Sequence, residues 1–101
     1  MDKLHGKSVE RLFDAILTLR TRGECYQFFE DVCTVNELLD LAQRFDVACM
    51  LTEGKIYTEI SKETGASTAT ISRVNKCLQY GSDGYKLVMD RIKEEEKHDG
   101  E

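Results

Sequence analysis

The stretch YTEISKETGASTATISRVNK, residues 57 to 76, predicts the fold better than any other part of the chain. It is typical of a helix-turn-helix, in which two short helices meet at a tight turn. Gly65 lies where the first helix must end, a place that often needs a positive φ and therefore favours glycine. The residues whose spacing predicts a small core shared by the two helices are Ile60, Thr64, Ala66, Ile71 and Val74.

The second helix of this motif has one polar face made mostly of small side chains. On a helical wheel, the apolar stripe that contains Ile71 and Val74 lies opposite this face. A helix that reads DNA enters the major groove N-terminus first, so small residues there allow close approach to the base edges. The sequence therefore predicts DNA binding, against the alternative of an ordinary helical hairpin with a solvated face. The polar face consists of Thr68, Ala69, Ser72 and Lys76.

The charge of the chain is negative overall but positive around this motif. The net charge is −5, whereas residues 55 to 93 carry seven Lys and Arg against four Asp and Glu. A local positive patch, rather than the net charge, decides where a phosphate backbone can bind. We therefore expect modest non-specific affinity for DNA and a dependence on fitted contacts.

Length and composition set further limits. A chain of 101 residues fits one small domain, whose core would be marginal without self-association. No segment is long and apolar enough to cross a membrane, and the N-terminus lacks the apolar core of a signal peptide. We expect a cytoplasmic protein without membrane contact.

The residue types needed for metal binding or catalysis are not grouped in this sequence. The cysteines are too widely spaced for a metal site and are expected to be small buried residues. We find no Ser/His/Asp set, no phosphate-binding glycine loop and no paired carboxylates, so we do not expect an enzyme. The four cysteines are Cys25, Cys33, Cys49 and Cys77.

Helical spacing and helix-end signals predict six helices and no strand. The first is an amphipathic helix between Gly6 and Gly23, and a second, short helix holds the aromatic residues up to Val32. The third begins at the capping box of Thr34 and Glu37, in which each side chain accepts a hydrogen bond from a free amide.

The third helix, which we expect to end near Leu51, is apolar on more than one face. A helix of this kind in so small a protein needs cover, and a second copy of the chain is the expected source. The last helix follows Gly81. Residues 94–101 contain no apolar side chain, so we expect a disordered acidic tail.

From about Thr34 to Ile92 the chain resembles the Trp repressor family, and within it the YerC/YecD subgroup. The similarity is carried by TVNE at 34–37, LAQR at 41–44, Gly54 and, most specifically, GASTATISR at 65–73. It implies an all-α, six-helix bacterial protein that forms an intertwined homodimer. Residues 1–93 would be a single DNA-binding domain, with the helix-turn-helix at about 57–79.

The same resemblance implies a function and the residues that perform it. Two helix-turn-helix motifs would read the half-sites of a palindromic operator on double-stranded DNA, usually to repress transcription. Family positions that read bases correspond to hydroxyl and methyl side chains here, and two basic residues are available for phosphates. The predicted DNA-binding residues are Thr58, Ser61, Ser67, Thr68, Ala69, Ser72, Arg73 and Lys76.

Members of that family bind tryptophan as a corepressor between the core and the helix-turn-helix. Val74 stands where the family has a glycine beside the indole, and its isopropyl group occupies space that the indole needs. We therefore expect no tryptophan and no cofactor, with a corepressor of another shape as the alternative. The matching effector positions are Arg44, Thr70, Arg73 and Cys77.

Two classes of function compete for this sequence. The first is a dimeric, sequence-specific transcriptional regulator, with or without a small-molecule corepressor other than tryptophan. The second is a dimeric protein-interaction module that does not bind DNA, which the acidic net charge and the weakly basic face favour slightly.

Overall fold

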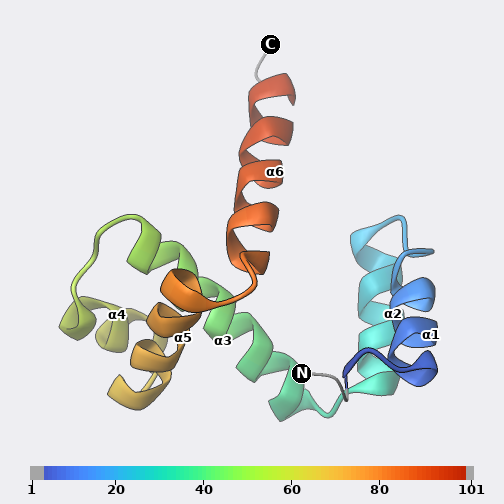
Figure 1. Cartoon of the computed structure of the whole chain (residues 1–101), viewed down its shortest axis with the longest axis horizontal. Helices are drawn as coiled ribbons and strands as arrows, with labels where there is room; N and C mark the ends of the chain where they lie inside the picture. Colours follow the sequence, from blue (N-terminus) through green and yellow to red (C-terminus); the bar gives the residue numbers. More distant parts are fainter. Residues whose placement is uncertain (1–3, 100–101) are drawn as a thin grey trace. The chain divides into compact units, whose positions relative to one another are not determined.

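The computed structural model describes residues 4–99, and these form six α-helices and no strand, which confirms the predicted all-α class (Figure 1). One chain divides into two compact units, which we call the N-terminal unit, residues 1–38, and the C-terminal unit, residues 39–101. From the sequence alone, residues 1–93 are expected to form a single domain. The helices are α1 (Lys7–Ile16), α2 (Arg22–Val32), α3 (Val35–Thr52), α4 (Tyr57–Thr64), α5 (Thr68–Tyr80) and α6 (Gly84–Asp99).

The N-terminal unit contains two helices without a buried residue. Neither α1 nor α2 has a buried side chain within one chain. Large apolar residues are exposed, among them Phe13 at 56 % and Leu17 at 80 % of their surface. Phe28 and Phe29 make an edge-to-face contact, with ring centroids 5.4 Å apart. The apolar faces of this unit are therefore available for contacts beyond the unit.

The first helix is shorter than the sequence predicts. It ends at Ile16 rather than continuing toward Gly23, which lies inside α2. Thr21 caps the next helix, because its side chain accepts a hydrogen bond from the Glu24 amide at 3.1 Å. The pattern Thr-x-x-Glu is itself a helix-start signal, and it overrides the apolar spacing that runs past Ile16.

The predicted capping box at the start of α3 is confirmed. The Thr34 amide donates to Glu37 Oε1 at 2.8 Å, and the Glu37 amide donates to Thr34 Oγ1 at 3.1 Å. These bonds satisfy amides that a helix start leaves without partners. They hold the pKa of the Glu37 carboxyl below its usual value, with the backbone amide of Thr34 as the largest cause.

The C-terminal unit has a core in which α4 and α5 pack on α3 (Figure 1). As the sequence predicts, Ile60, Ile71 and Val74 are buried, and they pack with Val47 and Ala48 of α3. Burial of these side chains removes apolar surface from water, which is the main stabilising contribution in a core of this size. The fully or almost fully buried residues are Val47, Ala48, Ile60, Ala66, Ile71 and Val74.

Gly65 ends α4 with φ 75° and ψ 3°, the left-handed conformation that the sequence predicts for the turn. Its amide donates to the Ser61 carbonyl at 2.8 Å. The next helix begins after only three residues, so α4 and α5 form the predicted helix-turn-helix, in residues 57 to 80.

The last helix, α6, packs partly on this core and continues farther than expected. The rings of Tyr85 and Phe45 stack with centroids 6.5 Å apart. Residues 94–99 are helical where the sequence analysis expects disorder, and residues 100–101 lie outside the described part of the chain. Glu and Lys are good helix formers, so the last turns can extend the helix although they carry no apolar side chain.

The cysteines are less buried than the sequence analysis expects. Within one chain Cys25 and Cys77 are exposed, whereas Cys33 and Cys49 are half-buried. No helix among residues 4–99 is long and apolar enough to cross a membrane.

Replacing Gly65 by Ala should destabilise the protein by about 1 to 2 kcal/mol, because the added Cβ is strained at positive φ. Urea unfolding at fixed protein concentration measures the change. Gly23→Ala is the matched control: this glycine lies in α2 without a positive φ, and alanine there should not destabilise. Equal losses in the two variants would contradict the assigned role of Gly65.

Glu37→Gln should lower stability at neutral pH and have less effect in acid. The folded-state pKa of Glu37 is lowered, so its carboxylate stabilises the fold above its ordinary pKa of 4.5. This contribution is lost as the pH falls through the lowered pKa. Urea unfolding of both proteins at neutral pH and at about pH 3 measures the difference. A gap that stays constant would show that the carboxylate charge does not matter.

Candidate nucleic-acid interface

The start of α5 is fixed by Ser67. Its hydroxyl accepts a hydrogen bond from the Thr70 amide at 3.1 Å and donates to Thr70 Oγ1 at the same distance. The remaining free amides of the first turn give the helix start a partial positive charge that favours anions such as phosphate. Thr68 and Ala69 follow directly and are exposed.

The two sides of α5 differ in burial as the helical wheel predicts. The core side is buried, with Ile71 at 0 % and Val74 at 2 % exposure. The opposite side is open to solvent, and its small residues leave the helix backbone accessible. Its exposed residues are Thr68, Ala69, Ser72, Arg73 and Lys76.

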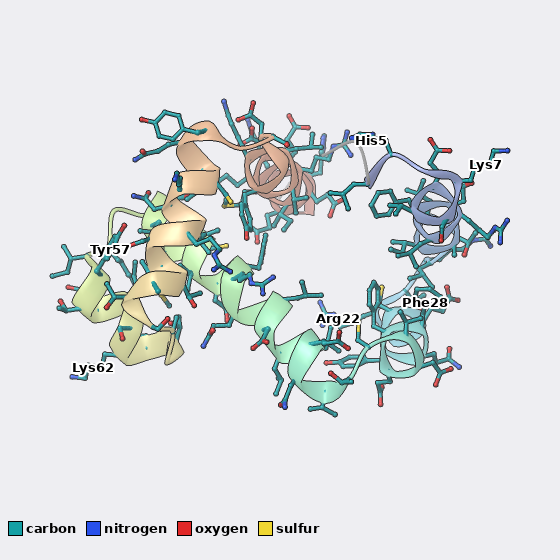
Figure 2. All side chains as sticks on the ribbon, turned by 60° about the horizontal axis from the view of Figure 1, so that its bottom comes forward. His5, Lys7, Arg22, Phe28, Tyr57 and Lys62 are labelled. Atoms are coloured by element: carbon teal, nitrogen blue, oxygen red, sulfur yellow. The ribbon has the colours of Figure 1, made fainter. Side chains whose placement is uncertain are left out.

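The residues of α4 that the sequence analysis assigns to DNA fall into two groups. Thr58 is exposed. Ser61 is half-buried, and its hydroxyl donates to the Ala66 carbonyl across the turn at 2.9 Å. Tyr57, at the start of α4 in Figure 2, accepts a hydrogen bond from Asn75 Nδ2 at 3.2 Å. Ser61 and Tyr57 thus hold the helix-turn-helix together, and Thr58 is free to contact a ligand.

A residue that the sequence analysis did not assign also contacts the turn. Gln43 of α3 donates from Nε2 to the Thr64 carbonyl at 3.0 Å. The two residues are 21 positions apart, so no helical spacing could indicate the contact. Thr64 Oγ1 in turn donates to the Ile60 carbonyl at 2.7 Å and accepts from the Ala66 amide at 3.1 Å.

The charges around the helix-turn-helix are few. The α5 helix carries Arg73 and Lys76 and no Asp or Glu. On α4, Glu63 forms an exposed ion pair with Lys55 at 3.4 Å, a contact that contributes little by itself. The α4 helix also carries Lys62, but its two glutamates leave it net negative, so α5 is the helix of the pair with a net positive charge.

The four predicted effector residues lie on two helices of the C-terminal unit. Arg44, on α3, is exposed, as are Arg73 and Cys77 on α5, whereas Thr70 is half-buried. Two of them, Cys77 and Arg44, affect the pKa of Tyr85 on α6. Burial raises the pKa of the Tyr85 hydroxyl, Cys77 raises it further, and the Arg44 guanidinium lowers it.

Tyr85 is half-buried at the start of α6. Tyr85 packs against the same core that contains Val74. The packing of Tyr85 on this core was not predicted from the sequence, because α6 was identified there only as a further apolar helix.

A cavity of about 390 Å³ lies elsewhere in the C-terminal unit, between α3, α5 and α6. None of the four predicted effector residues lines it. Among residues 4–99 no group of three His, Cys, Asp or Glu side chains could hold a metal ion. The cavity is lined by Leu51, Thr52, Asn75, Leu78, Lys86, Met89, Asp90 and Lys93.

Comparison with known proteins agrees with these features. Residues 7–93 match the family model described as Trp repressor protein. The chain is 57 % identical over 96 residues to an uncharacterized protein of Bacillus subtilis strain 168 called YerC, covering 95 % of this chain and 92 % of that protein.

Two crystal structures are also similar. One, of a TrpR-like protein from Eubacterium eligens, is 58 % identical with a TM-score of 0.89 and covers 91 % of this chain and 95 % of that one. The other, described as a candidate Trp repressor from Staphylococcus aureus, is 55 % identical with a TM-score of 0.88, over 91 % and 92 % of the two chains.

The matched region contains all six helices except the end of α6, so it includes the helix-turn-helix and every predicted site residue. The family is a regulatory one. Both the extent of the match and the identities establish the relationship. The chain belongs to the Trp repressor family.

Proposed function

We propose that this protein is a sequence-specific DNA-binding repressor of transcription, acting as a homodimer on a palindromic operator in the bacterial cytoplasm. The observation that carries this proposal is the division of α5 into a fully buried side and an exposed side of small polar residues. Family membership and the two similar crystal structures support it.

The exposed side of α5 has the chemistry for reading bases. The hydroxyls of Thr68 and Ser72 can donate to or accept from base edges in the major groove. The methyl groups of Thr68 and Ala69 can contact the methyl group of thymine. Arg73 and Lys76 are placed to contact phosphates beside the groove, which fixes register but carries no sequence information.

The exposed apolar surface supports a homodimer. Neither α1 nor α2 buries a residue within one chain, and Leu39 of α3 and Leu87 of α6 are 61 % and 51 % exposed. Soluble proteins rarely leave so much apolar surface uncovered. A second copy would cover it and place two helix-turn-helix motifs about 34 Å apart, one turn of DNA.

In the proposed function, DNA binding needs no tryptophan. Val74 is buried in the core, and Tyr85 packs against that core. In this proposal the isopropyl group of Val74 takes the space that the family leaves for its corepressor. The cavity between α3, α5 and α6 favours the alternative in which a ligand of another shape regulates the protein.

A protein-interaction module is the second candidate. The net charge of −5 and the presence of only two cations on α5 favour it, because phosphate contacts dominate the affinity for DNA.

Sequencing of genomic fragments retained by the purified protein without added ligand tests the proposal. Enrichment of a short palindrome is the expected result. A lack of enrichment with and without amino acids and related metabolites would contradict the DNA-binding function and leave the interaction module.

The double variant Thr68→Glu with Ser72→Glu should reduce DNA affinity by about a hundredfold or more, because two carboxylates would face the bases and phosphates. Fluorescence anisotropy with an enriched duplex measures the affinity. The control adds the same charge on α1 and α2, through Ser8→Glu and Gln27→Glu. Equal weakening by both double variants would show that net charge alone is responsible.

Arg73→Ala should weaken binding to all duplexes to a similar extent. The slope of log affinity against log salt concentration should fall by about one, the loss of one phosphate contact. Titrations at several salt concentrations measure this, with Arg91→Ala on α6 as the matched loss of charge. Unchanged DNA binding together with loss of a ligand response would assign Arg73 to an effector site instead. Unchanged DNA binding with no ligand response in either protein would contradict both roles.

A further inference from the structure

The C-terminal end of α4 depends on a side chain from another helix. The last carbonyl groups of a helix have no partner within it. Gly65 at the turn donates its amide to the Ser61 carbonyl, and the carbonyl of Thr64 accepts instead from Gln43 Nε2 at 3.0 Å. The contact is half-buried, so water does not readily replace it.

This contact is distinct among the side-chain hydrogen bonds of residues 4–99. It is the only one of them that joins α3 to the helix-turn-helix. In the core, α3 packs on this motif through the apolar side chains of Val47 and Ala48. Apolar packing is not directional, whereas a hydrogen bond requires a defined distance and angle.

The position of the contact links it to the residues that face DNA. Thr64 lies immediately before the turn, and Thr68 begins α5 four positions later. At its other end α4 is held to α5 by the bond from Asn75 to Tyr57. Motion of the turn relative to α3 would therefore move the whole helix-turn-helix, including the start of α5.

We propose that Gln43 is a positioning residue whose side-chain amide holds the helix-turn-helix on α3 in the orientation that reads DNA. This role rests on the proposed function and explains how the motif is oriented without a bound ligand. Gln43 does not itself contact DNA. Its amide is needed because a donor must face the Thr64 carbonyl, which a carboxylate would repel.

Two variants and two controls test this role. Gln43→Met keeps the length of the side chain but has no donor, and Gln43→Glu replaces the donor by a carboxylate. Gln27, exposed on α2 and without an assigned contact, provides the controls Gln27→Met and Gln27→Glu. All four are compared with the original protein at a temperature where circular dichroism shows each one fully folded.

Hydrogen exchange in the protein without DNA is the first measurement. The amides of Gly65 and Ala66 should exchange about tenfold faster in both Gln43 variants, because loss of the contact frees the turn. The Gln27 variants should exchange as the original protein does. Unchanged exchange at the turn would overturn the proposal.

Affinity for an enriched duplex is the second measurement. Both Gln43 variants should bind about tenfold more weakly, while the salt dependence stays the same because the phosphate contacts are still present. Faster exchange with unchanged affinity would show that Gln43 only stabilises the turn, and would overturn the positioning role. If the original protein binds no duplex, the proposed function fails as well, and the exchange data still show whether Gln43 holds the turn.

A pH titration covers the case in which Gln43→Met does not fold. Protonation of the carboxyl in Gln43→Glu restores a donor, so its affinity relative to Gln27→Glu should recover as the pH falls from about 6 to about 4. A ratio that stays constant over this range would overturn the proposal.

Discussion

The burial of Val47 and Ala48 of α3 against Ile60, Ile71 and Val74 is the contact on which the C-terminal unit depends. Helices as short as α4 and α5 are marginal in water by themselves, so their stability comes from this packing. The same contact turns one side of α5 inward and leaves the other side exposed. The stability of the unit and the presentation of its small polar residues therefore have one physical cause.

Features set by neighbouring residues could be predicted from the sequence. Gly65 identifies the turn because its conformation is one that other residues rarely adopt. Thr34 and Glu37 form a cap because three residues separate them. Burial of Val74, and with it the exposed side of α5, follows from helical spacing. These parts of the fold and of the candidate site involve residues that are close in sequence, so the geometry of one helix or turn is sufficient to predict them.

Contacts between distant parts of the chain could not be predicted in this way. The bond from Gln43 to Thr64 and the stacking of Tyr85 on Phe45 depend on how α3 packs, which spacing along the sequence does not indicate. Helix ends were misjudged where two local signals compete, as at Ile16, or where helix propensity alone extends a helix, as in residues 94–99. The division of the chain into two compact units likewise depends on contacts between distant residues, which spacing along the sequence does not indicate.

The burial of Val74 has a consequence for how such a protein would be controlled in a cell. If Val74 fills the ligand region and no other ligand binds, occupancy of DNA would change with the amount of the protein. For a dimer assembled from weakly stable monomers, occupancy rises more steeply than in proportion to concentration, because assembly and DNA binding both require protein. The rates of synthesis and degradation of the protein would then set its occupancy of DNA, in place of the concentration of a metabolite.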